Sequence, residues 1–206
     1  MLWLAVFRRA LGRASHDVKD ALNGVSVNLE VIRSRAARPD ADAAAVAPFA
    51  DAAGQQLERL TTLIEAVLAL GRAEREPADV AVILRRLATL CGASASSADA
   101  EVLVELGDVE SAVTRVPGDA VRLALAAPLL ELATGADRFA RATPVRCTVR
   151  EAEQAIVVTI GAAGRRAEMP DAVVDALRAA GVRWTAGEQG DAGSGPTDLS
   201  LAFPRA

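Results

Sequence analysis

The residues best suited to chemistry lie near the N-terminus, in the stretch from Ser15 to Glu30. This stretch holds the only histidine, His16, and the only lysine, Lys19, of the 206 residues. A histidine imidazole is a competent nucleophile near neutral pH, because much of it is uncharged there. Lys19 lies about one helical turn away and could neutralise negative charge on the group under attack. Asp17 could accept the second ring N–H and so fix which nitrogen attacks.

A long helix is predicted to carry these residues, from near the N-terminus to about residue 35. Apolar residues recur at steps of four and three, interrupted at Arg8 and Ser15, which is typical of a heptad seam. His16 lies off this seam, on a polar face with Lys19 and Asp20. The simplest interpretation of an isolated histidine is a solvated side chain, but the surrounding pattern is more specific. The seam residues are Leu4, Leu11, Val18, Leu22, Val25, Leu29 and Ile32.

A second long helix is predicted from near Asp42 to Gly71 or Arg72, after a break at Pro39. Two amphipathic helices joined by a short loop form an antiparallel hairpin. A lone hairpin with a sustained seam cannot bury both of its apolar faces, whereas two copies can. We therefore expect a homodimer held by a four-helix bundle.

The pattern changes beyond a charged, proline-containing linker at 74–79. Helices are predicted at 80–91, 119–134 and 171–180, and strands at 101–106, 145–150, 155–160 and 197–203. The predicted fold class is therefore α + α/β: a helical hairpin (residues 1–73) followed by a small α/β sandwich domain (residues 77–206).

Composition limits the remaining classes. A net charge of −4 without a basic block gives no reason to expect a nucleic-acid partner. The apolar segment 1–7 is too short for a membrane span and has the wrong flanks for a signal peptide, so we expect no membrane association and a cytoplasmic location. Cys91 and Cys147 match no metal spacing and are expected to be buried free thiols.

The stretch around His16 resembles the phosphoacceptor box of two-component histidine kinases, and 57–70 resembles the second helix of their dimerisation domain. The box reads His-Asp/Glu-apolar-Lys/Arg-Asn/Thr-Pro-Leu and continues to Asn-Leu-Glu. Here Asp20 replaces the usual Asn or Thr, and Ala21 replaces the usual Pro. The matching residues are His16, Asp17, Val18, Lys19, Leu22, Asn23, Asn28, Leu29 and Glu30.

The second half resembles the ATP-binding domain of the same kinases, but it lacks three features on which nucleotide binding depends. No asparagine follows Asn28, so the magnesium-binding helix is missing, and only Glu131 could hold a metal in the matching segment. The adenine loop, at 160–164, has no acid. The lid and phosphate turn look deleted, and the glycine-rich stretch 187–195 is interpreted as a hairpin loop.

These resemblances imply a dimeric histidine phosphotransferase, a pseudokinase-like protein that does not bind ATP or phosphorylate itself. His16 would become a phosphohistidine, with Asp17 and Lys19 assisting, and would shuttle the phosphoryl group between aspartates of response regulator receiver domains. The chain itself would bind no cofactor, because magnesium would come with the receiver. The receiver would dock on Arg13, Asp20, Asn23, Gly24 and Val27.

Asp20 admits two interpretations, and two other functions compete with phosphoryl transfer. An acid on the face of His16 would repel a phosphoryl group and puts phosphatase activity in doubt; it could pair with Lys19, Arg13 or a cation of the partner, or be simply solvated. The first competing function is a non-catalytic dimeric module that docks a response regulator or a kinase. The second is a divergent ATP-dependent histidine kinase.

Overall fold

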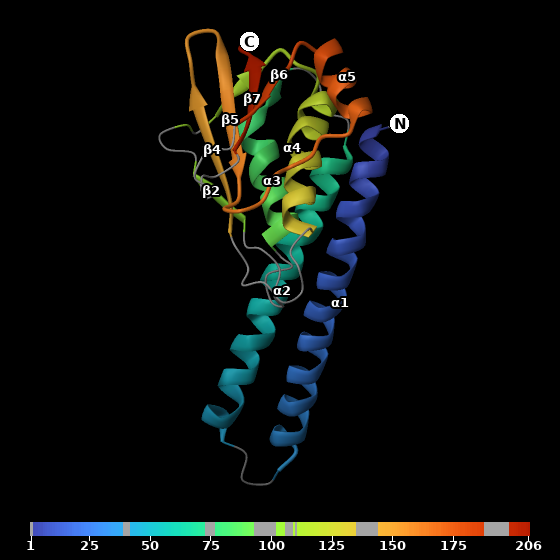
Figure 1. Cartoon of the computed structure of the whole chain (residues 1–206). Helices are drawn as coiled ribbons and strands as arrows, with labels where there is room; N and C mark the ends of the chain where they lie inside the picture. The colour runs from blue at the N-terminus through green and yellow to red at the C-terminus, as the bar shows by residue number, and fades with distance from the viewer. Residues whose placement is uncertain are drawn as a thin grey trace.

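The computed structural model describes residues 2–38, 42–72, 77–92, 102–105, 109, 111–134, 144–187 and 198–206. Two long helices, α1 (Leu2–Ala36) and α2 (Ala43–Gly71), form an antiparallel hairpin, as predicted. The α/β part packs beside the half of the hairpin that contains the N-terminus, and the other half extends away from it (Figure 1). Residues 74–76 of the expected linker (74–79) and residues 188–195 of the glycine-rich stretch (187–195) lie outside the described residues.

The hairpin is closed by small residues on α1. Ala10, Ala14 and Ala21 are buried together with Val25, and α2 contributes Ala53, Leu60, Leu63, Ala66 and Leu70 to its buried face. Small side chains allow the two helices to approach closely. At the far end, the Arg35 guanidinium donates a hydrogen bond to the carbonyl of Ala45 (2.9 Å) and stacks over the ring of Phe49.

The predicted heptad seam therefore divides into two faces. Val25 lies against α2, and Val18 and Ile32 are half-buried, but Leu4, Leu22 and Leu29 are exposed. Within one chain the seam is therefore only partly buried, and the small residues Ala10, Ala14 and Ala21 make up most of the buried face of α1. The exposed leucines form a separate apolar stripe on α1. Alpha-helix α2 adds large exposed apolar residues of its own: Leu57, Ile64 and Leu68.

The α/β part contains a five-stranded sheet with the order β2-β4-β5-β7-β6, in which only β2 and β4 are parallel. Its strands are β2 (Val102–Glu105), β4 (Val145–Glu151), β5 (Ala155–Gly161), β6 (Arg183–Ala186) and β7 (Leu199–Pro204). A separate two-stranded ribbon joins β1 (Ala78–Asp79) to β3 (Val113–Thr114). The helices are α3 (Val80–Gly92), α4 (Gly118–Thr134) and α5 (Asp171–Ala179). The predicted helices and strands are confirmed to within a few residues, whereas β1, β3 and β6 were not predicted.

One hydrophobic core joins the hairpin to the α/β part. Ala10, Ala14 and Leu70 of the hairpin belong to the same cluster of buried residues as the apolar side chains of α3, α4 and the sheet. Helix α4 runs beside α1 (Figure 1), and Arg9 of α1 pairs with Glu131 of α4 at 3.9 Å. The hairpin is thus held against the second part by burial of apolar surface. None of the helices in the described part of the chain has the length and apolarity of a membrane span.

The start of α3 is fixed by Asp79. Its Oδ1 accepts hydrogen bonds from the backbone N–H groups of Val82 (3.0 Å) and Ala112 (3.3 Å), and its Oδ2 accepts one from the Ser111 hydroxyl (2.6 Å). Burial acts to raise the pKa of Asp79, but these hydrogen bonds outweigh it and hold the pKa below the ordinary 3.8. The carboxylate therefore caps the helix and also ties it to the β1–β3 ribbon.

We predict that Asp79→Ala lowers the free energy of unfolding by about 1–2 kcal/mol at neutral pH, since it removes a helix cap and leaves N–H groups without their acceptor. Because folding lowers the pKa of Asp79, its contribution is complete above the unfolded-state pKa and is lost as the pH falls through the lower, folded-state pKa. Urea denaturation of both proteins at several pH values measures the difference. Ser111→Ala, which removes one donor only, is the control and should cost less. Equal stability of the wild type and Asp79→Ala at pH 7 would contradict the assignment.

Candidate functional site

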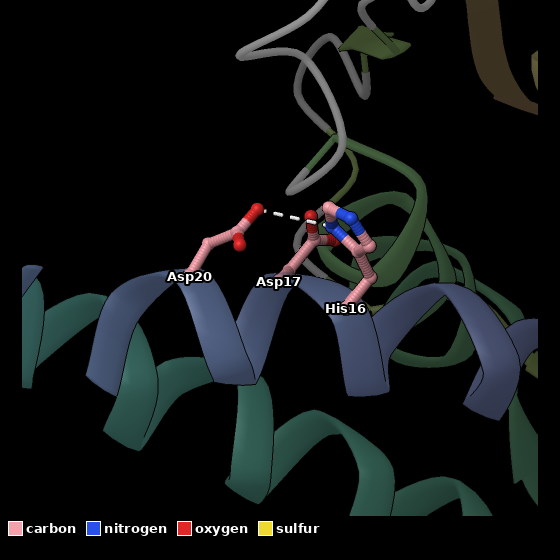
Figure 2. A group of neighbouring side chains, drawn as sticks. All are labelled: His16, Asp17 and Asp20. Atoms are coloured by element: carbon pink, nitrogen blue, oxygen red, sulfur yellow. Dashed lines mark ion pairs between the residues drawn. The ribbon is translucent and has the colours of Figure 1, made fainter. Parts of the chain in front are cut away.

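His16 lies in the middle of α1, on the side of the helix that faces away from the seam with α2. Its side chain is 76% exposed, in agreement with the predicted polar face. Figure 2 shows His16, Asp17 and Asp20 rising from one side of the helix. The ring is therefore accessible to another protein, and it is held on a rigid helix rather than on a loop.

The ring is oriented by Asp20. Nδ1 of His16 lies 3.0 Å from Oδ2 of Asp20, one helical turn further along (Figure 2). This is within the range of a charge-assisted hydrogen bond from Nδ1–H to a carboxylate. Sequence reasoning expected Asp17 to orient the ring and left Asp20 open between pairing with a cation and solvation. The spacing of four residues on a helix, at which side chains meet, was the signal that pointed to Asp20.

Asp17 has a different environment from Asp20. It is 6% exposed, and it is one of only two charged residues among the buried residues of the described chain. Its carboxylate still lies close to the other two side chains, because one ligand atom from each of His16, Asp17 and Asp20 lies within 4.8 Å of the others. These three residues are the group in the described chain with the donor atoms and spacing to hold a metal ion.

Lys19 and Asp20 line an open groove on the exposed side of α1, together with Leu22, Asn23 and Ser26. Lys19 is exposed, as a side chain that neutralises an incoming anion must be. The groove follows the helix from Lys19 to Ser26, in the direction of the hairpin loop. It provides a polar floor with an apolar edge at Leu22, next to the candidate nucleophile.

The other predicted contact residues differ in their placement. Asn23 and Val27 are exposed, in agreement with the prediction. Gly24 is half-buried, and a side chain at this position would lie 3.4 Å from the Gln56 side chain of α2. The expectation that Gly24 is exposed for docking is wrong, because the position faces the other helix of the hairpin. The side chain of Arg13 lies outside the described residues.

The structure also places the segments that the sequence analysis compared with a kinase nucleotide site. Helix α4 is buried on most sides, and Glu131, the only candidate metal ligand in its segment 125–133, pairs with Arg9. The predicted adenine loop is a tight turn in which Ala162 bridges to Arg165 and Gly164 has a φ of 72°. A Cβ on Gly161 would collide with the Asp198 side chain, which would have to move to admit a larger residue. Only three residues separate α5 from β6, since the former ends at Ala179 and the latter begins at Arg183.

Comparison with known proteins gives distant structural likenesses. No protein-family model matches the chain, and no curated protein matches it significantly. Among solved structures, the Acinetobacter baumannii histidine kinase AdeS is similar over 92% of this chain and 98% of its own, with 14% identity and a TM-score of 0.46. A bacterial phosphotransferase is similar over 97% and 95%, with 15% identity and a TM-score of 0.46. The histidine kinase domain of the Erythrobacter litoralis EL346 blue-light activated kinase is similar over 96% and 94%, with 12% identity and a TM-score of 0.45.

Proposed function

We propose that this protein is a histidine phosphotransferase that passes a phosphoryl group between receiver-domain aspartates through His16. The observation that carries the proposal is the contact of 3.0 Å between Nδ1 of an exposed His16 and the Asp20 carboxylate. A neutral imidazole has one N–H and one lone pair. A proton held on Nδ1 by Asp20 leaves the lone pair on Nε2, which becomes the nucleophile.

In the proposed transfer, Nε2 attacks the phosphorus of an aspartyl phosphate on the receiver. An N–P bond forms, the P–O bond to the aspartyl group breaks, and the electron pair leaves with the receiver carboxylate. The ring then carries a positive charge that it shares with the Nδ1–H, and Asp20 lies where it stabilises this charge. Return to a second receiver reverses these steps, so the protein supplies positioning and charge neutralisation rather than an energy source.

Lys19 and the groove beside it support the same function. A phosphoryl group in transfer spreads negative charge over its oxygens, and a nearby ammonium stabilises that charge. The polar residues of the exposed groove, Lys19, Asp20, Asn23 and Ser26, offer the receiver a docking surface, with Val27 further along. Magnesium would be held by the receiver, in the cytoplasm, and this chain would need no cofactor.

The packing of the second part supports a function without ATP. Helix α4 presents apolar residues to the core on nearly all sides, and Glu131 is engaged by Arg9. The turn after β5 carries no acid, and the link between α5 and β6 is too short for a lid. The α/β part would then act as a structural or docking module.

The exposed apolar stripe supports a homodimer. Leu4, Leu22 and Leu29 of α1, with Leu57, Ile64 and Leu68 of α2, are all more than two-fifths exposed in the single chain. Such a surface is costly to leave in water, and a second hairpin would cover it in a four-helix bundle. His16 lies on another face of α1, so the bundle would leave it accessible.

A second candidate function is a dimeric binding module that docks a response regulator without accepting phosphate. The proximity of the Asp20 carboxylate to the ring favours it, because a fixed negative charge opposes the approach of a phosphoryl group. The two candidates differ in the fate of His16 when a phosphorylated receiver is present.

The first prediction concerns the ring tautomer. We expect the Nδ1–H form to dominate in neutral His16 of the wild type, and Asp20→Ala to shift the ring towards the Nε2–H form that free imidazoles of this type prefer. Nitrogen-15 spectra of the imidazole measure this directly, and a single histidine makes the assignment unambiguous. Asp17→Asn is the control and should change the tautomer less. A dominant Nε2–H form in the wild type would contradict the proposed role of Asp20.

The second prediction concerns transfer. Wild-type protein should take phosphate from a phosphorylated receiver as an acid-labile adduct, and His16→Ala should abolish this while leaving receiver affinity nearly unchanged. Asp20→Ala should slow transfer by about 10- to 100-fold through loss of ring orientation. Lys19→Ala should slow it by about tenfold or more through lost charge neutralisation. Single-turnover transfer of labelled phosphate is the measurement.

The outcomes of this experiment separate the candidate functions. A receiver that binds well but exchanges no phosphate with wild-type His16 in either direction identifies a binding module. Incubation with labelled ATP alone should leave His16 unlabelled. Labelling at His16 from ATP, together with saturable ATP binding by calorimetry, would instead identify a divergent kinase.

The third prediction concerns the dimer. Leu29→Asp should convert a dimer into monomers, because the charge would be buried without a partner at a cost of several kcal/mol, on the order of 3 or more, in each copy of the interface. Light scattering and sedimentation measure the mass. Val27→Asp is a matched control, since Val27 is 55% exposed and Leu29 51%, but the two lie on different sides of α1. Val25 is unsuitable, because it is buried against α2 of its own chain. A wild-type monomer at micromolar concentration would exclude the bundle.

A further inference from the structure

The group formed by His16, Asp17 and Asp20 has a second chemical capacity. It places an imidazole nitrogen and two carboxylate oxygens within 4.8 Å of one another on slightly more than one turn of α1 (Figure 2). One side of the group is accessible through the groove along Lys19 and Asp20, and the other is closed by the buried Asp17. An imidazole with two carboxylates is a donor set that zinc and neighbouring transition metals use in proteins.

We propose that His16, Asp17 and Asp20 bind a divalent transition metal ion of the zinc class, and that this ion switches off His16 as a phosphoacceptor. The binding half of the proposal stands on the geometry alone. The switching half rests on the proposed phosphotransferase function.

The donors of His16 and Asp20 suit such an ion with little movement, and the donors of all three residues, which lie within 4.8 Å of one another, close further around it. Zinc lies about 2.0–2.1 Å from imidazole nitrogen and about 2.0–2.2 Å from carboxylate oxygen, so two ligands in tetrahedral arrangement lie roughly 3.3 Å apart. Nδ1 of His16 and Oδ2 of Asp20 are 3.0 Å apart. Insertion of the ion therefore requires these two atoms to separate by only a few tenths of an ångström, and the adjoining groove leaves space for water as a fourth ligand.

The donor set also selects the class of ion. Magnesium prefers six oxygen ligands and keeps several waters, so an imidazole nitrogen gives it no advantage. Zinc, cobalt and nickel bind imidazole well. The two carboxylates supply two negative charges, and Lys19 in the adjoining groove supplies one positive charge. The negative charge is the larger, so the site attracts a divalent cation.

Metal binding would invert the tautomer that transfer requires. The ion takes the lone pair of Nδ1, so the proton on Nδ1 leaves to solvent and a solvent proton occupies Nε2. The ring stays neutral, and no net proton is gained or lost. Nε2 then carries N–H in place of a lone pair and cannot form a bond to phosphorus. Asp20 changes from acceptor of the ring N–H to metal ligand, so one residue serves both states of the switch.

Binding is tested first, on the full chain without any receiver. Isothermal calorimetry with zinc and visible absorption with cobalt report occupancy, and nitrogen-15 spectra with zinc report the ring tautomer. We expect one ion per chain and a change from Nδ1–H to Nε2–H. Asp20→Ala should weaken binding by about tenfold or more, and His16→Gln should do the same. Asp51→Asn, an exposed acid on α2, is the control and should bind as the wild type does. Absence of saturable binding, or binding that Asp20→Ala and His16→Gln leave unchanged, overturns the metal site and leaves the proposed function untouched.

Transfer is tested second, with a phosphorylated receiver in excess magnesium. Zinc at saturating concentration should slow phosphorylation of His16 by about tenfold or more, while extra magnesium should not. Asp20→Ala serves as the internal control, because its slower transfer should be insensitive to zinc, whereas an effect of zinc on the receiver would slow both proteins. Undiminished transfer by the zinc-loaded wild type overturns the switch. If metal-free protein binds zinc but never accepts phosphate, the proposed function and the switch both fail, and the metal site stands.

Discussion

The close contact between α1 and α2 is the constraint on which the rest of the structure depends. Alanines at positions 10, 14 and 21 allow the helices to approach, and Val25 continues the same face. Once this face is fixed against α2, the 3.6-residue period of the helix determines in which direction every other side chain of α1 points. The leucine stripe of Leu22 and Leu29 lies next to the seam, and His16 lies on the side away from it. The accessibility of the imidazole is therefore a consequence of where the small residues stand.

The second part of the chain acts on the site through the same helix. Helix α4 lies between the sheet and the N-terminal half of α1, and its residues are buried around most of its circumference. A helix enclosed in this way contributes apolar surface to the core and has few positions left for metal or nucleotide ligands. The ion pair of Arg9 with Glu131 joins the same two helices at their surface. The α/β part thus packs against α1 on the N-terminal side of His16 and supports the candidate site on a rigid helix.

Long periodic segments could be predicted from the sequence, and short or contact-dependent features could not. The hairpin, α3 to α5 and the strands β4, β5 and β7 follow from apolar periodicity, which burial in a core enforces. The ribbon of β1 and β3 has two residues in each strand, too few for any alternation. The division of the heptad pattern into two faces depends on alanines, which have no strong preference between core and surface. His16 and Lys19 could be predicted from residue type and spacing. The contact of the imidazole with Asp20 could not, because helical spacing allows this contact but side-chain rotamers decide whether it forms.

The acid at position 20 changes the chemistry that a histidine on this helix can perform. An amide or hydroxyl there could donate or accept, and so would leave the ring free to choose its tautomer, but an ionised carboxylate only accepts. In the proposed transfer, Asp20 would therefore select the Nδ1–H ring and attract the imidazolium that forms when Nε2 binds phosphorus. The same charge would repel the oxygens of a phosphoryl group on Nε2, but these would lie on the far side of the ring, so the attraction would act over the shorter distance and be the stronger of the two. Lys19 in the adjoining groove offsets the remaining repulsion. An acid next to His16 is thus compatible with the proposed transfer, and Lys19 would strengthen that compatibility.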